Sequence, residues 1–255
     1  MVVVCFVLSL GMAFTSSALI YDVTIDGSDA IFIAGRTDVP IPALDGNPNA
    51  YILRRHGFIT PEAIVETLPP VISVVAGDVV KVADAAVGGV SFFNGVGAPF
   101  FGPGGNGVSG SNLSSLGGIS GYIGPQGPLT GVFLNNNIPN IGPAPATLDF
   151  SLGGLGINFL SLTPGLGQIF YIGDGLTDAA LFQSFTAPVG ATRLFLGIPD
   201  GFGFVGVPGA YDDNDGAYRV RIGVNETPII PEPSTVLLLG SGLIAAVVLR
   251  RKISG

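Results

Sequence analysis

The chain has 255 residues, of which 40 are glycine and 20 are proline, and it is 47% hydrophobic but only 11% charged. The hydrophobic content is sufficient for a core, and the many turns that Gly and Pro form favour β-structure over helix. The formal net charge of −8 argues against nucleic acid and anionic membrane surfaces as partners, because both bind basic patches. Divalent cations and neutral glycans are compatible with this charge.

The N-terminal segment, residues 1–18, has the pattern of a signal peptide. Residues 2–14 are almost entirely apolar and are followed by the small residues Thr15–Ala18, which predicts cleavage after Ala18. A buried first strand is the alternative interpretation of the apolar run. Cys5 is the single cysteine, so its removal with the signal peptide excludes disulfides, thiolate metal ligands and cysteine nucleophiles from the mature protein.

The body, residues 19–224, is predicted to be one all-β domain, a jelly roll or β-sandwich of about ten strands with long loop insertions. Two stretches without strand pattern, 37–68 and 95–128, are predicted to be the insertions. In the first, Glu62 and Glu66 fit one helical turn after Pro61 better than a carboxylate pair. The segments with the alternation or β-branched character of strands are 21–25, 30–35, 71–77, 78–84, 89–93, 131–135, 167–173, 181–188, 192–198 and 217–223.

Motifs that carry catalysis are missing from the sequence. It contains no nucleophile elbow, P-loop or zinc-binding His motif, and its two G-x-G-x-x-G runs do not lie between a strand and a helix. His56 is the only histidine, and it has no identifiable nucleophile to activate, so a surface position explains it better. We therefore expect that the protein is not an enzyme.

An acidic turn stands out near the end of the body, in "PGAYDDNDGAY", residues 208–218. Asp212, Asp213 and Asp215 surround Asn214 there, and a like-charged pair at ~4 Å costs roughly 1 kcal/mol even in bulk water. Asp200 ends an earlier apolar strand and can fold back toward this turn. Clustered carboxylate and amide oxygens suit Ca²⁺, which takes six to eight oxygen ligands in a flexible geometry. A solvated surface turn is the alternative.

The same region resembles the calcium-dependent galactose-binding lectins of the bacterial PA-I type, a small jelly-roll family. The similar stretches lie between Val71 and Ile222: "AGDVVKV", "GPGGN", "LTGVFLN", "FYIGDG", "FTAPVGATRLFLGIPD" and "PGAYDDNDGAYRVRI". Residues 201–207 are inserted relative to the lectins, and the stretch 95–128 offers only Gln126 for their sugar-reading His and Gln. The resemblance implies that Ca²⁺ is held by the side chains of Asp200, Asp213 and Asn214 and by backbone carbonyls of Ala210 and Phe92.

Two functions follow from this resemblance and from the acidic turn. The first is carbohydrate binding, in which calcium contacts the hydroxyls of a glycan or exopolysaccharide and the rings of Tyr211, Phe202 and Phe204 pack against the sugar. The second is a structural or adhesive role in an extracellular matrix, in which calcium only fastens a loop and no sugar binds.

The C-terminal segment, residues 225–255, has three parts. The tripeptide Pro231, Glu232 and Pro233 comes first, the uncharged run Thr235–Leu249 second and the basic residues 250–252 last, which predicts a short transmembrane helix over 234–249 with a cytoplasmic basic end. This pattern resembles the PEP-CTERM sorting signal of exported bacterial proteins. It implies an exosortase that cuts near the tripeptide, a transient anchor in the inner membrane, and a final location at the cell surface or in the extracellular matrix.

Overall fold

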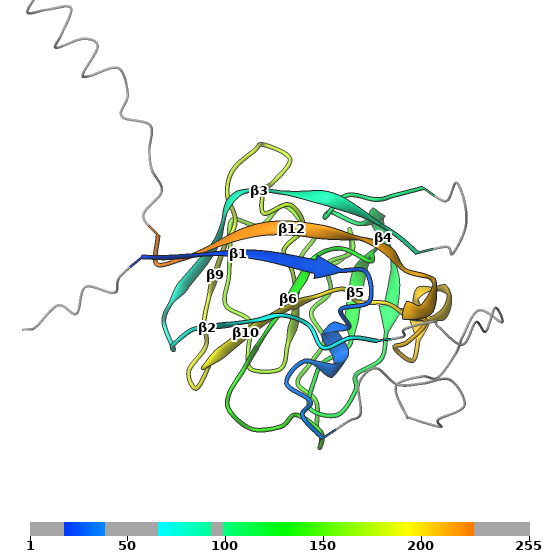
Figure 1. Cartoon of the computed structure of the whole chain (residues 1–255), viewed down its shortest axis with the longest axis horizontal. Coiled ribbons are helices and arrows are strands. Elements are labelled where there is room, and N and C mark those ends of the chain that lie inside the picture. The colour runs from blue at the N-terminus through cyan, green and yellow to red at the C-terminus, as the bar shows by residue number, and fades with distance from the viewer. Residues whose placement is uncertain (1–17, 39–65, 93–98, 227–255) are drawn as a thin grey trace, which may run out of the picture.

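The computed structural model describes residues 18–38, 66–92 and 99–226, which form one β-rich body (Figure 1). The predicted signal peptide, apart from Ala18, and the predicted sorting signal, apart from Asn225 and Glu226, lie outside these residues, as does His56. Among the residues that the structure describes, no helix is long and apolar enough to cross a membrane. The expected all-β class of the body is confirmed.

The strands of the described residues form three sheets with the orders β1-β12-β3-β9-β7, β2-β10-β6-β8 and β11-β4-β5. Three short 3-10 helices, η1 (Ile31–Ile33), η2 (Phe202–Phe204) and η3 (Tyr211–Asp213), connect them. The strands are β1 (Leu19–Asp26), β2 (Val71–Ser73), β3 (Val79–Ser91), β4 (Asn106–Leu113), β5 (Tyr122–Gln126), β6 (Thr130–Leu134), β7 (Ser161–Leu162), β8 (Ile169–Tyr171), β9 (Ser184–Thr186), β10 (Arg193–Gly197), β11 (Val205–Gly206) and β12 (Asp215–Val224).

Eight of these strands are nested in chain order. The first strand pairs with the last, β1 with β12, and the pairs β2–β10, β3–β9 and β6–β8 follow inward, all antiparallel. These eight strands can therefore be described as one long hairpin that is folded over to form the two larger sheets. An eight-stranded jelly roll has this strand order. This nesting brings the two ends of the body together at one end of the molecule (Figure 1).

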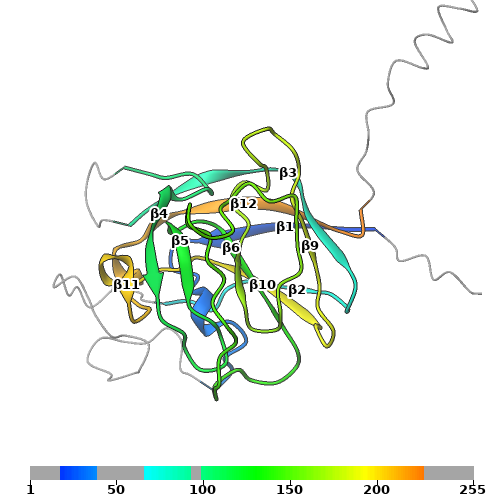
Figure 2. The same cartoon turned by 180° about the vertical axis from the view of Figure 1, so that it is seen from behind.

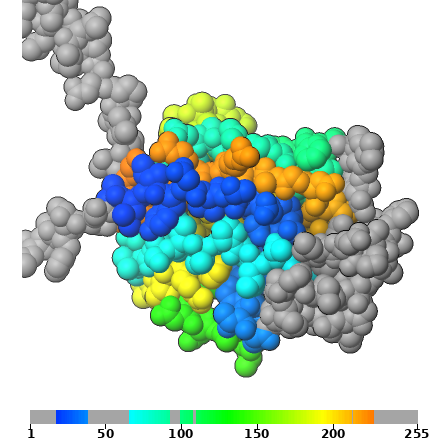
Figure 3. Space-filling model, viewed as in Figure 1, coloured from blue at the N-terminus to red at the C-terminus, as the bar shows by residue number. Residues whose placement is uncertain are grey.

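The two larger sheets pack on each other over one hydrophobic core. Phe170 of β8 and Phe185 of β9 belong to different sheets, yet their ring centroids are 4.9 Å apart. Along β12 the alternate residues Tyr218, Val220 and Ile222 are buried, whereas Arg219 and Arg221 between them are exposed, because successive side chains of a strand point to opposite faces. The outward side of β1, β12 and β3 forms one face of the molecule (Figure 3).

The stretch 95–128 was expected to be a loop insertion, and the structure corrects this expectation. In its described part, β4 and β5 pair antiparallel and β11 adds to β4 in parallel (Figure 2), so the stretch contains a small sheet where the sequence indicated a loop. The Gly-, Ser- and Asn-rich sequence of β4 has no hydrophobic alternation, and its register shifts between Asn106 and Ser111. Pairing with β5, the next strand, and with the distant β11, and not local propensity, makes this segment extended.

Three local expectations are also corrected. Residues 30–35, expected as a strand, contain η1, whose three apolar residues are all buried and therefore show no alternation. Residues 78–84 and 89–93 are not separate strands, because β3 runs through both. Thr67 forms a parallel bridge with Asp29, so the predicted helical turn does not extend to this residue.

Candidate functional site

The candidate site is a cavity of about 200 Å³ at the end of the body where β12 begins. The residues that line it include Phe92, Asp200, Ala210 and Asp213, four of the five positions that the sequence assigned to calcium. They come from three places in the chain: the end of β3, the end of β10 and the turn before β12. The fifth, Asn214, directly follows Asp213 but does not line the cavity.

Asp200 is held by the segment that follows it. Gly201 N donates to Asp200 Oδ1 at 2.6 Å, and Gly209 N donates to the carbonyl of Asp200 at 3.1 Å. Gly201 and Pro208 also form an antiparallel bridge, so the inserted residues 201–207 leave and return at the same point. The Asp200 side chain is buried at the base of this loop.

Tyr211 holds the end of β10 in place through its hydroxyl group. Its hydroxyl donates to the carbonyl of Ile198 at 2.7 Å and accepts from the backbone N–H of Asp200 at 3.1 Å. Burial, and then the nearby carboxylate of Asp200, raise the pKa of Tyr211 well above its ordinary value, so the hydroxyl stays protonated as a donor. The ring is only 1% exposed, which corrects the expectation that it packs against a sugar.

Ala210 adopts an unusual backbone conformation. Its φ of 68° and ψ of 28° are left-handed, a conformation that costs a non-glycine residue roughly 1–2 kcal/mol. Such strain persists where the surrounding structure determines it, and it is frequent at functional sites. Here it turns the chain from Gly209 into η3, and η3 places Asp213 at the same cavity.

The side chain of Asn214 is oriented by a hydrogen bond to the backbone. Its Nδ2 donates to the carbonyl of Gly27 at 2.9 Å, and a Cβ at Gly27 would lie 3.1 Å from Asn214 Cβ, so glycine allows the close approach. Asn214 Oδ1 is buried and has no hydrogen-bond partner among the described residues. The next residue, Asp215, is exposed at the start of β12, and the side chain of Asp212 lies outside the described part of the chain.

Aromatic rings form the apolar wall of the cavity. Phe92 and Phe204 both line it, and their centroids are 5.6 Å apart at 87°. Phe204 is buried, which corrects its expected role as a sugar platform, whereas Phe202 is 43% exposed. Gln126 of β5 also lines the cavity and accepts a hydrogen bond from Asn106 at 2.8 Å. The comparison with the lectins singled out Gln126 as the one residue that the stretch 95–128 offers for their sugar-reading side chains, but its position at this cavity was not expected, because the strand that carries it was not expected.

The atoms at this cavity that could bind a metal ion are oxygens. They belong to the carboxylates of Asp200 and Asp213 and to the backbone, and the side-chain amide of Asn214 lies next to the cavity. Within residues 18–38, 66–92 and 99–226, no group of three or more His, Cys, Asp and Glu side chains is placed to hold a metal ion. A cation at this cavity would therefore need amide and carbonyl oxygens besides Asp200 and Asp213. Calcium accepts such mixed oxygen ligands.

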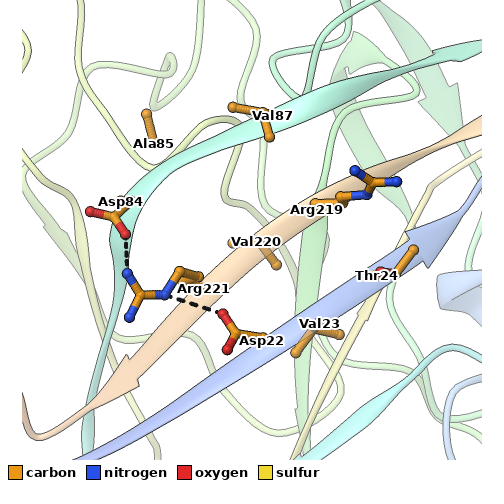
Figure 4. A pocket seen from close by; sticks show the side chains of 9 residues that line it. All are labelled: Asp22, Val23, Thr24, Asp84, Ala85, Val87, Arg219, Val220 and Arg221. Carbon is orange, nitrogen blue, oxygen red and sulfur yellow. Dashed lines mark hydrogen bonds and ion pairs between the residues drawn. The ribbon is translucent and has the colours of Figure 1, made fainter.

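A second, larger hollow of about 420 Å³ lies on the outer face of β1, β12 and β3 (Figure 4). Arg221 crosses it, with its Nε 3.1 Å from Asp22 and a second ion pair to Asp84. All three side chains are exposed to solvent, and exposed ion pairs contribute little to stability. The sequence did not predict this hollow, because its residues come from three strands that are distant in the chain.

Comparison with known proteins adds one finding. A family model described as the PEP-CTERM protein-sorting motif matches residues 230–252. No curated protein and no solved structure matches the chain, so the resemblance of the body to the PA-I type lectins has no support from a homologue. The chain thus carries at its C-terminal end the motif of exported proteins that an exosortase sorts.

Proposed function

We propose that the body of this exported protein is a calcium-stabilised module of the cell surface or extracellular matrix. The observation that carries the proposal is the convergence of Phe92, Asp200, Ala210 and Asp213 on one cavity. The carboxylates of Asp200 and Asp213, the amide oxygen of Asn214 and the carbonyls of Ala210 and Phe92 would hold the ion. Calcium would then join the end of β10 to the start of β12.

The geometry favours this structural role over an open sugar site. Small-molecule sites usually enclose about 300–1,000 Å³, whereas this cavity measures about 200 Å³. Two of the three rings expected to pack against a sugar, Tyr211 and Phe204, are buried. A calcium ion in this place would neutralise buried carboxylates and fix the inserted residues 201–207.

Carbohydrate binding is the second candidate function, and one observation favours it. Phe202 is 43% exposed and lies between Gly201 and Gly203, which both line the cavity. A sugar ring packed on Phe202 could place its hydroxyls at the rim, near Gln126. A glycan or exopolysaccharide is the ligand class that this arrangement fits.

The first experiment is a thermal unfolding series of residues 19–230 with chelator and with millimolar calcium. Calcium that binds only the folded protein raises stability by RT ln(1 + [L]/Kd), which is about 2.7 kcal/mol at 100-fold saturation. Asp200→Asn and Asp213→Asn should each abolish this gain, because each removes a charged ligand while keeping the side-chain shape. Asp215→Asn is the matched control and should retain it. Magnesium should stabilise less, because it demands a tighter octahedral cage.

An unchanged midpoint in calcium would contradict the metal site and both functions built on it. A glycan array probed with and without chelator then separates the two candidates. Chelator-sensitive binding that Phe202→Ala weakens would support the carbohydrate function. If calcium stabilises the protein but no glycan binds, the result would support the structural role.

A further inference from the structure

The two ends of the body lie side by side, opposite the cavity. Leu19 at the start of β1 pairs with Val224 at the end of β12. The turn between β2 and β3 reaches the same place, since Leu19, Val75 and Val224 line one hollow. Two hydrogen bonds, Gly77 N to the carbonyl of Ala187 and Ala187 N to the carbonyl of Asp78, tie the turn between β9 and β10 to it.

Exposed apolar side chains gather at this end. Leu19 is 48% exposed, Val75 63% and Val189 90%, and we call these three residues the terminal face. The adjoining hollow of about 300 Å³ is lined mainly by apolar residues, and Asp78 is its one charged side chain. Asp78 accepts hydrogen bonds from Val75 N at 2.8 Å and Asn225 Nδ2 at 2.6 Å. The side chains of the terminal face are therefore all apolar, and once the predicted signal peptide is removed the charge that its residues carry is the α-amino group of Leu19.

Asn225 fixes the point at which the chain leaves the body. Its Oδ1 accepts from Val79 N at 2.9 Å, and its own N–H donates to the carbonyl of Val79 at 2.8 Å. Only nine residues, 226–234, separate it from Thr235, where the uncharged run of the sorting motif begins. The ten Cα–Cα steps from Asn225 to Thr235 span at most ~36 Å.

We infer that the terminal face rests on the lipid bilayer while the chain is still an uncut exosortase precursor. The short tether holds the body at a high effective concentration beside the membrane, so a few apolar side chains suffice for contact. Because the face presents no basic side chain and only the single α-amino group of Leu19, the contact should not require anionic lipid. The cavity at the start of β12 then points away from the membrane, about 30 Å along a ten-residue strand. This orientation does not depend on calcium.

Tryptophan reporters test the orientation, because the chain contains no Trp. Val75→Trp and Val189→Trp report on the terminal face, and Val205→Trp, at a position 61% exposed near the cavity, is the matched control. Each variant, as residues 19–255 without the predicted signal peptide, is reconstituted in phosphatidylcholine vesicles with brominated acyl chains. Several-fold stronger quenching and a blue-shifted emission are expected for the first two variants, relative to the control.

Equal quenching at all three positions would overturn the inference, as would quenching that appears only with phosphatidylglycerol. Quenching that depends on protein density would also overturn it, because a second copy of the chain would then cover the face. Amide exchange on the unsubstituted chain provides a second measurement. Residues 187–191 should exchange several-fold more slowly in the vesicle-bound precursor than in residues 19–230 alone, and equal rates would contradict the contact.

Discussion

Gly127 supports the cavity from the side of β5. Its φ is +56°, and a Cβ there would lie 2.1 Å from Cζ of Phe92, one of the residues that line the cavity. Its carbonyl accepts a hydrogen bond from the buried hydroxyl of Tyr218 at 2.9 Å. A single residue without a side chain therefore sets the distance between β5, β12 and the end of β3.

Gly127→Ala should destabilise the protein by ~2–5 kcal/mol, because left-handed strain and a clash with Phe92 add together. Urea unfolding of residues 19–230 measures the change. Gly156→Ala is the matched control: Gly156 has a φ of +64° but nothing within 4 Å of its Cβ position, so only the strain of roughly 1–2 kcal/mol applies. Equal losses of stability in Gly127→Ala and Gly156→Ala would contradict this prediction, because the Phe92 ring would then move aside without a cost in free energy.

Asp29 should make stability depend on pH. Burial raises its pKa to about 6 from 3.8, although Thr67 Oγ1 and the backbone N–H of Asp26 donate to its oxygens. Between pH 4 and 6 the folded protein retains a proton that the unfolded chain has released, so this group's contribution to stability falls as pH rises, by at most ~3 kcal/mol. From pH 4 to pH 7 the unfolding free energy of Asp29→Asn should fall less, or rise more, than that of the wild type. An unchanged difference would contradict the assignment.

The sequence could predict part of the site because that part is local. Asp213 and Asn214 lie in one acidic turn, and Asp200 ends a recognisable apolar strand, whereas Ala210 and Phe92 were assigned only by the resemblance to the lectins. The burial of Tyr211 and the position of Gln126 at the cavity could not be predicted, since both depend on contacts between segments that are distant in the chain. An aromatic residue next to an acidic turn gives no signal of whether its ring faces solvent or supports the strand beneath.

Among the elements, β12 shows why most strands of the two larger sheets could be predicted. Its buried and exposed residues alternate, and this alternation is visible in the sequence. The fully buried η1 and the glycine-rich β4 do not alternate, and the hydrophobic pattern therefore misassigned both. The partners of each strand could not be predicted either, because β2 and β3 follow each other closely yet enter different sheets.

Neighbouring residues of β12 should respond very differently to truncation. Ile222→Ala should cost about 2–5 kcal/mol, because Ile222 is fully buried between the sheets. Arg221→Ala should cost less than about 1 kcal/mol, since its ion pairs with Asp22 and Asp84 are exposed. Chemical denaturation of both variants measures the two costs. A loss at Arg221 as large as that at Ile222 would mean that the exposed ion pairs act as a strong network.

For the whole molecule, the C-terminal motif has a direct consequence for processing. Mature protein isolated from the cell surface should begin at Leu19 and end near Pro231–Pro233, because we expect the predicted signal peptide and the sorting motif at residues 230–252 both to be removed. Mass spectrometry of the intact protein measures both ends. Surface material that still carries Arg250, Arg251 and Lys252 would contradict the second cut.

The antiparallel pairing of Leu19 with Val224 also determines how the body responds to mechanical force. A pull between the two chain ends would peel β1 from β12 one residue pair at a time, beginning at this pair. A pull between the cavity and the C-terminal tether runs along β12 instead, and β12 lies between β1 and β3. Such a load is shared at once by the hydrogen bonds on both sides of the strand. The fold therefore resists a force that pulls on the cavity end of the body while the C-terminal segment is anchored.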